Sequence, residues 1–351
     1  MIKIMDYSKT ANEEIFFRGM SASGVENIVA DIISDVKENK DKALFKYCKK
    51  FDNTDTDELE VTDAEIDEAF AGVDPHFIEV IQKAARNIYN YHKHQVKNSF
   101  IISENDGVVL GQKVTPLKRA GIYVPGGTAA YPSTVLMNNI PAKIAGVEEI
   151  IMTSPAKDGK INPIILAAAK IAGADRIFKV GGAQAVAALA YGTETIPRVD
   201  KIVGPGNAFV AEAKKQVFGL VDIDMVAGPS EILVIADGNS DCKTVAADML
   251  SQAEHDKLAS AVLVTDSRSL AGGVAAEIER QLKLLPREEI ARTSIENNGK
   301  IIITENILQA IDIANEIAPE HLEICVDNPF DYLDKIRNAG SIFMGRNCPE
   351  A

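Results

Sequence analysis

Apolar side chains recur at three- and four-residue steps from about residue 23 to residue 99, which is the spacing of one helix face. The clearest stretch consists of Val25, Ile28, Val29, Ile32 and Ile33. The Thr-Asp-Ala-Glu sequence at 62–65 has the form of a capping box, in which the first and fourth side chains satisfy each other's backbone amides. This part of the chain is therefore predicted to be helical.

A short β-hairpin is expected next. Residues 100–102 and 108–110 are apolar, and Asn105, Asp106 and Gly107 lie between them. An Asp-Gly pair readily adopts the positive backbone angles of a tight hairpin turn. The hairpin would precede the main body of the protein.

From residue 121 onward, apolar runs alternate with Ala-rich helical segments. One series of expected strands covers residues 121–125, 149–153, 176–180, 201–203 and 222–226. A second series covers residues 232–236, 261–265, 300–304, 322–326 and 341–344. This rhythm is typical of parallel sheets with right-handed crossovers. It predicts an α/β fold with two Rossmann-like parallel-sheet units in tandem, preceded by the helical segment and the hairpin.

The expected organisation has three parts. Residues 1–119 form the helical segment and hairpin, packed on the second α/β unit; residues 120–230 form the first α/β unit, and residues 231–351 form the second. No Pro-rich linker or charge block separates the two units, and their similar size suggests an internal duplication. No residue-level repeat proves it.

Composition narrows the function. With 46% hydrophobic and 25% charged residues the chain is an ordinary globular protein, and its net charge of −14 repels phosphate backbones and anionic membranes. Nucleic acid and membranes are therefore not expected as partners. No apolar stretch is long enough to span a bilayer. The four cysteines are scattered, which fits a reducing, cytoplasmic location.

Four glycine-rich turns follow strands of the first series, and each carries one polar side chain: Tyr123, Gln184, Asn207 and Ser230. In parallel α/β sheets, ligands bind at the carboxyl ends of the strands, and glycine allows close approach of the backbone. Glycine is also ordinary in any strand-to-helix turn. The set predicts a cleft for a polar ligand, but the standard dinucleotide fingerprint is absent, so the pattern alone does not indicate NAD.

A second cluster lies on an expected helix over residues 242–255. Asp248, Gln252 and His255 follow one another at steps of four and three, which places them on one polar stripe beside an apolar face. Imidazole and a side-chain carbonyl at this spacing can reach one divalent cation such as zinc. A hydrogen-bonded histidine at a helix end explains the same pattern, so both interpretations stay open.

The third cluster is Glu320 and His321, just ahead of an expected strand. Adjacent side chains point apart along an extended chain, so the two are not expected to pair directly. They could serve separate steps, the histidine as a base and the glutamate as an activator of water. An exposed loop that carries both residues is the alternative.

Taken in order, six sequence blocks resemble the signature blocks of the histidinol dehydrogenase family. They lie at residues 121–127, 180–185, 204–207, 227–231, 251–255 and 318–321. The resemblance implies a zinc-dependent, NAD-linked enzyme of histidine biosynthesis, cytoplasmic and homodimeric. Its reaction would be the four-electron oxidation of L-histidinol to L-histidine through an enzyme-bound aldehyde, with two NAD⁺ used in succession.

The resemblance also implies a role for each matching residue. Gln252 and His255 match two zinc ligands, and the metal would hold the substrate's amino and imidazole groups. His321 matches the general base, and Glu320 matches the residue that activates water. The positions that match NAD contacts are Tyr123, Gln184 and Asn207. The positions that match substrate-binding residues are Ser230, Gln252, His255 and His321.

The chain departs from the family pattern at its end. Family members continue into a stretch with two more zinc ligands, an Asp and a His, and then into a small C-terminal domain that reaches the partner subunit. We therefore expect an incomplete zinc site, impaired activity and a weakened dimer for residues 1–351. Two other interpretations stay open: a non-catalytic nucleotide-binding remnant, and a dehydrogenase for a related amino alcohol.

Overall fold

The computed structural model describes residues 1–17, 24–104, 107–126, 130–226 and 228–348. The chain divides into two compact units. Residues 22–227 form one, called here the central unit, and residues 1–21 together with 228–351 form the other, called the terminal unit. No helix among the described residues is long and apolar enough to cross a membrane.

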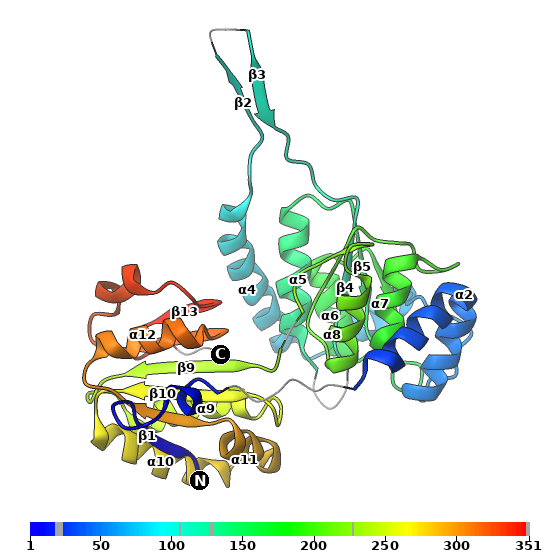
Figure 1. Ribbon diagram of the computed structural model, residues 1–351. Coiled ribbons are helices and arrows are strands. Elements are labelled where there is room, and N and C mark those ends of the chain that lie inside the picture. The colour runs from blue at the N-terminus through cyan, green and yellow to red at the C-terminus, as the bar shows by residue number, and fades with distance from the viewer. Residues whose placement is uncertain (18–23, 105–106, 127–129, 227, 349–351) are drawn as a thin grey trace. The chain divides into compact units, whose positions relative to one another are not determined.

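The central unit is built on a five-stranded parallel sheet with the strand order β6-β5-β4-β7-β8. Figure 1 shows two of its strands, β4 and β5, among the helices of the unit. Its strands are β4 (Arg119–Tyr123), β5 (Glu149–Thr153), β6 (Arg176–Phe178), β7 (Lys201–Val203) and β8 (Asp222–Ile223). The five strands coincide with the first predicted series to within a few residues at each end. They are almost entirely buried, as expected for a parallel sheet covered on both faces.

Helices cover both faces of this sheet. One face packs against α3 (Asp63–Gly72), α4 (Pro75–His92), α5 (Pro132–Ile144) and α6 (Pro163–Ala172). The other packs against α2 (Glu26–Phe51), α7 (Gly182–Tyr191) and α8 (Ala208–Val217). Neighbouring strand residues alternate between the two cores, so that Ile122 joins the first and Tyr123 the second. The predicted capping box is present, because Thr62 and Glu65 satisfy each other's backbone amides.

A hairpin extends from the central unit beyond α4, after the short 3₁₀ helix η1 (Lys93–Gln95) (Figure 1). Its strands β2 (Phe100–Ser103) and β3 (Val109–Gln112) pair antiparallel, and both are exposed along their whole length. Gly107 has the positive φ expected of the turn, at 76°. The other two predicted turn residues, Asn105 and Asp106, lie outside the described residues.

The terminal unit contains a six-stranded parallel sheet with the order β1-β11-β10-β9-β12-β13. Its strands are β1 (Lys3–Asp6), β9 (Glu231–Ala236), β10 (Ser260–Thr265), β11 (Lys300–Ile303), β12 (His321–Cys325) and β13 (Ser341–Met344). One face packs against α9 (Cys242–Ala253), α10 (Arg268–Leu282) and α11 (Glu288–Asn297). The other packs against α1 (Asn12–Ile15) and α12 (Ile307–Ile317), with η2 (Pro329–Lys335) beside them.

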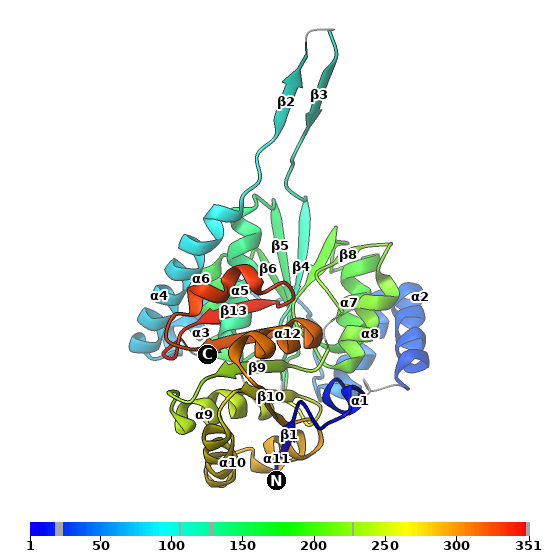
Figure 2. The same ribbon diagram turned by 60° about the vertical axis from the view of Figure 1, so that its left-hand side comes forward.

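The two units share one topology. If the five strands of each series are numbered along the chain and the added edge strand β1 is left aside, both sheets have the strand order 3-2-1-4-5. The order therefore reverses between β4 and β7 in the central unit and between β9 and β12 in the terminal unit. Figure 2 shows β4, β5 and β6 of the central sheet, and β9 and β10 of the terminal sheet, from a second direction. The prediction of two Rossmann-like parallel sheets in tandem is confirmed.

The expected first part, residues 1–119, is divided between the two compact units. Only the first 21 residues join the terminal unit, where β1 adds to β11 in parallel. The helices α2 to α4 instead bury their apolar stripes against α5 to α8 of the central unit. Amphipathic spacing shows that a helix has a partner, but the sheet that it covers depends on contacts between distant residues.

Candidate active site

Three of the predicted glycine turns meet at the carboxyl edge of the central sheet. The backbone N–H of Gly182, after β6, donates to the hydroxyl of Tyr123, at the end of β4, over 3.1 Å. Side-chain atoms at Gly126 and Gly181 would lie 2.3 and 2.5 Å from Pro155, so both positions need glycine for the turns to pack. Gly127 lies outside the described residues. The turns form one layer of closely packed backbone.

Tyr123 is the buried polar group of this edge, with 4% of its surface exposed. Burial raises the pKa of its phenol to about 12, and the nearby Asp52 carboxylate acts in the same direction, although the Gly182 N–H opposes both. The phenol therefore stays protonated at neutral pH. Its oxygen accepts from Gly182, which leaves its proton to donate to a ligand.

Gln184 lies at the start of α7 and is 2% exposed. A Cβ atom at Gly182 would approach the Gln184 side-chain oxygen to 2.7 Å, so the amide lies over the first turn of the helix. The N-cap of α7 is Gly181, which offers no side-chain hydrogen bond. The Gly182 N–H is bound by Tyr123, and the other N–H groups at this helix N-terminus form an environment that favours an anion such as a pyrophosphate.

Asn207 has a structural role of its own. It is the N-cap of α8, and its Oδ1 accepts from the backbone N–H groups of Phe209 and Val210 at 3.1 and 3.2 Å. Its carbonyl oxygen is therefore committed to the helix. Any contact with a ligand at this turn would use the Nδ2 donors.

The remaining predicted residues lie in the terminal unit, at the amino-terminal edge of its sheet. Ser230 directly precedes β9, and its carbonyl accepts from the backbone N–H of Ser260 over 3.0 Å. His321 opens β12, the parallel neighbour of β9, in register with Ile232. Gln252 and His255 come at the end of α9, just before β10, which pairs with β9 on its other side. Ala227, the first residue of the fourth turn, lies outside the described residues.

His321 is held by the backbone of β9. Its Nδ1 lies 2.9 Å from the Glu231 carbonyl oxygen, and its side chain is 20% exposed. Because a carbonyl only accepts, Nδ1 carries the proton in this bond, and the lone pair of a neutral ring is then on Nε2. This is the tautomer that a base acting through Nε2 requires.

Glu320 and His321 share no hydrogen bond, but they lie closer together than side chains that point apart along an extended chain would. Glu320 Oε2 lies 3.7 Å from His321 Nδ1, and it also accepts from the backbone N–H of Glu231 at 3.3 Å. Glu320 precedes the strand in a bend, so the alternation of an extended chain does not apply to it. The carboxylate and the imidazole are therefore neighbours, both anchored to Glu231.

Gln252 and His255 are also brought together. The helix ends at Ala253, two residues earlier than the predicted stripe requires, and His255 follows in a turn. Its Nδ1 nevertheless lies 3.4 Å from the Gln252 Oε1. Gln252 is 1% exposed, whereas His255 is exposed to solvent. The predicted metal pair thus joins a buried oxygen to an accessible imidazole.

This spacing fits two ligands of one zinc ion. Ligand atoms about 2.1 Å from a tetrahedral metal lie about 3.4 Å from each other, close to the observed separation. Within the described part of the chain, no group of three or more His, Cys, Asp or Glu side chains is placed to hold a metal. The structure places Gln252 and His255 where both could contact one zinc ion.

The carboxyl edge of the terminal sheet, where a ligand would be expected by analogy with the central unit, is held by an ion pair. Arg346 contacts Asp237 at 2.7 Å and Asp327 at 3.0 Å, and it donates to the Cys325 carbonyl at 2.9 Å. These acids follow β9 and β12, the strands at which the order reverses. In this unit the candidate residues lie at the amino edge of the sheet, so the expectation that ligands bind at the carboxyl ends of parallel strands does not predict their position.

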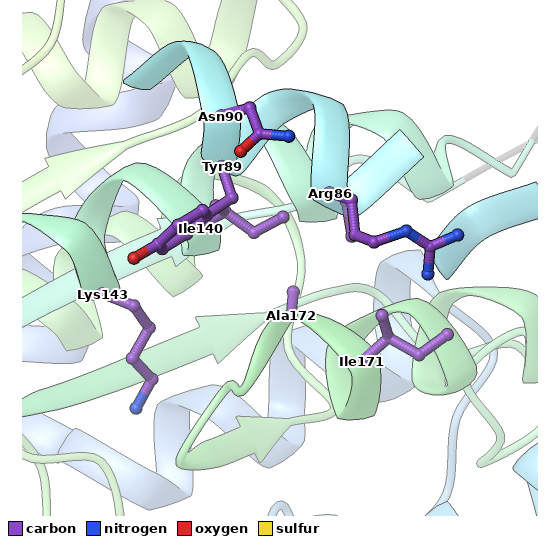
Figure 3. Close-up of a pocket in the computed structure, with 8 residues that line it drawn as sticks. Arg86, Tyr89, Asn90, Ile140, Lys143, Ile171 and Ala172 are labelled. Carbon is purple, nitrogen blue, oxygen red and sulfur yellow. The ribbon is translucent and has the colours of Figure 1, made fainter. Parts of the chain in front are cut away.

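A separate cavity of about 400 Å³ lies among α4, α5 and α6 of the central unit (Figure 3). Arg86 and Lys143 stand at opposite ends of an apolar floor that includes Ile140 and Ala172 (Figure 3). Lys143 pairs with Asp175 at 2.9 Å. None of the candidate residues lines this cavity, so it is separate from the candidate site.

Sequence reasoning missed three residues around these sites. Glu231 anchors Glu320 and His321 through its backbone, which no side-chain pattern reveals. Lys214 and Asp224 hold the turn that follows β7, and Lys214 is 1% exposed. In the sequence, the ion pair of Lys214 and Asp224 is indicated only by the acidic Asp224, two positions after the start of β8.

A parallel sheet whose strand order reverses, with glycine turns at its carboxyl edge, is the architecture of a nucleotide-binding α/β protein. A family model described as histidinol dehydrogenase matches residues 18–351. The chain therefore belongs to the histidinol dehydrogenase family, NAD-linked oxidoreductases of histidine biosynthesis.

Individual relatives agree with the family match. The histidinol dehydrogenase of Clostridium acetobutylicum is 54% identical over 356 residues, covering 100% of this chain and 83% of the relative. That of Streptococcus mutans is 56% identical over 326 residues, covering 93% and 76%. The crystal structure of histidinol dehydrogenase from Elizabethkingia anophelis superposes with a TM-score of 0.95 at 40% identity, covering 99% of this chain and 81% of that one.

Proposed function

We propose that this protein oxidises L-histidinol to L-histidine in two steps. In the first, the alcohol loses a hydride to NAD⁺ and a proton to a base, which gives the aldehyde. In the second, water adds to the aldehyde, and the hydrate loses a second hydride to another NAD⁺ and protons to solvent, which gives the carboxylate. Two hydrides account for the four electrons. The observation that carries the proposal is the pairing of Glu320 and His321 on the backbone of Glu231.

His321 is the proposed base. Its Nδ1–H is directed to the Glu231 carbonyl, so Nε2 receives the alcohol proton. The imidazolium that results lies 3.7 Å from the Glu320 carboxylate, which stabilises its positive charge. A side chain anchored at the start of a buried strand also loses little entropy when it reacts.

Glu320 is the proposed activator of water. Its side chain is 48% exposed, so water reaches the carboxylate without a conformational change. One oxygen is bound by the Glu231 N–H and the other can accept from a water molecule. Glu320 thus serves only the addition of water in the second step, whereas His321 takes a proton in both hydride transfers.

The carboxyl edge of the central unit is the proposed dinucleotide site. NAD⁺ supplies the hydride acceptor when it binds there. Tyr123 would donate its phenol proton, Asn207 its Nδ2 protons and Gln184 its amide, and the remaining N–H groups in the first turn of α7 would favour the pyrophosphate. The closely packed glycine turns let the backbone approach the ligand.

The terminal unit supplies the proposed substrate contacts. Gln252 Oε1 and His255 would bind zinc, and the metal would hold the amino and imidazole groups of histidinol so that the alcohol carbon is oriented for hydride transfer. Ser230 lies at the same sheet edge as His321 and is the proposed hydroxyl contact to the substrate. The donor set of these residues, an imidazole and a neutral oxygen, is one that zinc accepts.

The separate roles of Glu320 and His321 predict that Glu320→Gln slows aldehyde oxidation more than alcohol oxidation. The variant should be made in the extended chain, defined as residues 1–351 followed by the C-terminal segment of the Clostridium acetobutylicum relative. Glutamine keeps an acceptor for the Glu231 N–H but cannot take a proton, so aldehyde oxidation should slow about 10²-fold and alcohol oxidation less than about threefold. Single-turnover NADH absorbance separates the two steps.

The matched control is Glu316→Gln, an exposed glutamate one helical turn earlier in the sequence. It should leave both steps unchanged. Equal slowing of the two steps by Glu320→Gln would refute the separate roles of Glu320 and His321.

The proposed partner is a second copy of this chain, and the hairpin β2–β3 is the proposed contact. Ile101, Val109 and Leu110 are 78%, 64% and 60% exposed, and the hairpin presents apolar side chains on both faces. An isolated two-stranded hairpin is marginally stable in water, and apolar patches of this size mark interaction surfaces. Burial against an identical hairpin would cover it.

This contact predicts a monomer for the double variant Ile101→Asp/Val109→Asp. Charges on the hairpin would have to be desolvated at the interface, so the mass in sedimentation velocity should fall from that of a dimer to 37.8 kDa. Leu284→Asp is the control, because Leu284 is 70% exposed in the terminal unit. A monomeric unmodified chain at micromolar concentration, or a dimeric double variant, would contradict the proposed contact.

A further inference from the structure

A buried ion pair lies beneath the turn that follows β7. Lys214 on α8 is 1% exposed, and its Nζ is paired with the carboxylate of Asp224, one residue beyond β8. An ammonium group removed from water in this way is costly unless all its protons are bound. An apolar side chain at position 214 would avoid this cost of desolvation, yet the chain has a charged lysine there.

Both backbone groups of one residue in the turn are bound by this pair. Lys214 Nζ donates to the Gly204 carbonyl at 3.0 Å, and the Gly204 N–H donates to Asp224 Oδ2 at 2.7 Å. The other Asp224 oxygen accepts from the backbone N–H of Met225 at 2.6 Å. The ion pair thus fixes the peptide units on both sides of Gly204.

Gly204, which follows β7, also packs closely against the end of the neighbouring strand β4. Its φ of 113° is a conformation that favours glycine, and a Cβ there would lie 2.1 Å from the Tyr123 carbonyl oxygen. Tyr123 ends β4, the strand beside β7, and the strand order reverses between them. A small rotation at Gly204 would therefore move both the turn that leads to Asn207 and the backbone of Tyr123.

We infer that Lys214 and Asp224 are positioning residues that hold the Gly204–Asn207 turn, and through it Tyr123, in the geometry that receives the dinucleotide. This inference rests on the proposed dinucleotide site. Replacing a buried ion pair by apolar groups is often neutral for stability, so stability alone does not account for it. Binding sites need their supporting groups within about 0.5 Å, and the pair supplies that restraint.

The test compares NADH affinity with stability in the 351-residue chain. Lys214→Met should weaken NADH binding, measured by fluorescence titration, by roughly tenfold or more, because the turn loses a restraint. It should also lower the melting temperature, since Asp224 loses its partner. The double variant Lys214→Met/Asp224→Asn removes the unpaired charge, so its melting temperature should recover while NADH affinity stays low.

Lys215→Met is the matched control. Lys215 is the next residue, 60% exposed and paired with Glu212 on the surface, so its loss should change neither quantity. Hydrogen exchange supplies a second measurement: the peptide that contains Gly204 should exchange faster in both Lys214 variants and at the unmodified rate in the control.

The outcomes separate this inference from the proposed function. If the unmodified chain binds NADH and the Lys214 variants bind it equally well, the positioning role is overturned and the dinucleotide site stands. Unchanged exchange at Gly204 in those variants also overturns the positioning role. If the unmodified chain does not bind NADH, the dinucleotide site itself is overturned, and the inference with it.

Discussion

Replacing His321 by alanine in the extended chain is expected to slow both hydride transfers by about 10²-fold or more, which corresponds to roughly 2.7 kcal/mol of lost transition-state stabilisation. Both steps need a group that takes a proton from the oxygen bound to the reacting carbon. His321 presents Nε2 for this purpose because its Nδ1–H is directed to the Glu231 carbonyl. Histidinol binding should survive, since the proposed zinc ligands Gln252 and His255 remain. The measurements are stopped-flow NADH absorbance and a separate histidinol titration.

His94→Ala is the matched control for this variant. His94 is exposed on η1 in the central unit, so its removal should leave turnover within about twofold of the unmodified value. Turnover near normal in His321→Ala would exclude His321 as the base. Loss of histidinol binding together with turnover would instead assign His321 a binding role.

The polypeptide of residues 1–351 is expected to hold almost no zinc and to produce no NADH from histidinol. The family resemblance assigns four protein ligands to the metal, and Gln252 and His255 are the two that these residues contain. A neutral amide oxygen is a weak zinc ligand, and two ligands rarely retain the ion. Metal analysis after dialysis should find less than about 0.1 zinc per chain, against about one in the extended chain.

Folding should not depend on that metal. The central and terminal sheets and their four cores are formed by described residues, so circular dichroism and melting should show a cooperative α/β protein without zinc. Stoichiometric zinc with steady NADH production by residues 1–351 would overturn the transfer of the family's metal site to this chain. Zinc binding that survives Gln252→Ala and His255→Ala in the extended chain would do the same.

The strands could be predicted from the sequence with little error. β5, β7 and β13 begin and end at the expected residues, because the strands of buried parallel sheets are short apolar runs bounded by turns. The strand β1 was missed. It is an edge strand in which only Met5 is buried, so its residues show no continuous apolar run.

The candidate site was only partly predictable. The sequence identified the residue types at Tyr123, Gln252 and His321, because imidazole, amide and phenol groups at turns and helix ends are unusual enough to notice. It placed Glu320 apart from His321, whereas the bend before β12 brings them to 3.7 Å. The bend at Glu320 removes the alternation of an extended strand, and spacing along the chain does not predict such a bend.

The sequence by itself determined the two parallel sheets, the order of elements and, through its motifs, the family. These follow from local hydrophobic runs and short segments that each carry their own information. Only the tertiary structure decided at which sheet edge the candidate residues lie: the carboxyl edge in the central unit and the amino edge in the terminal unit, where Arg346 holds the opposite edge. It alone showed that Lys214 is buried against Asp224, since the burial of a charge depends on the partners that folding brings to it from distant parts of the chain.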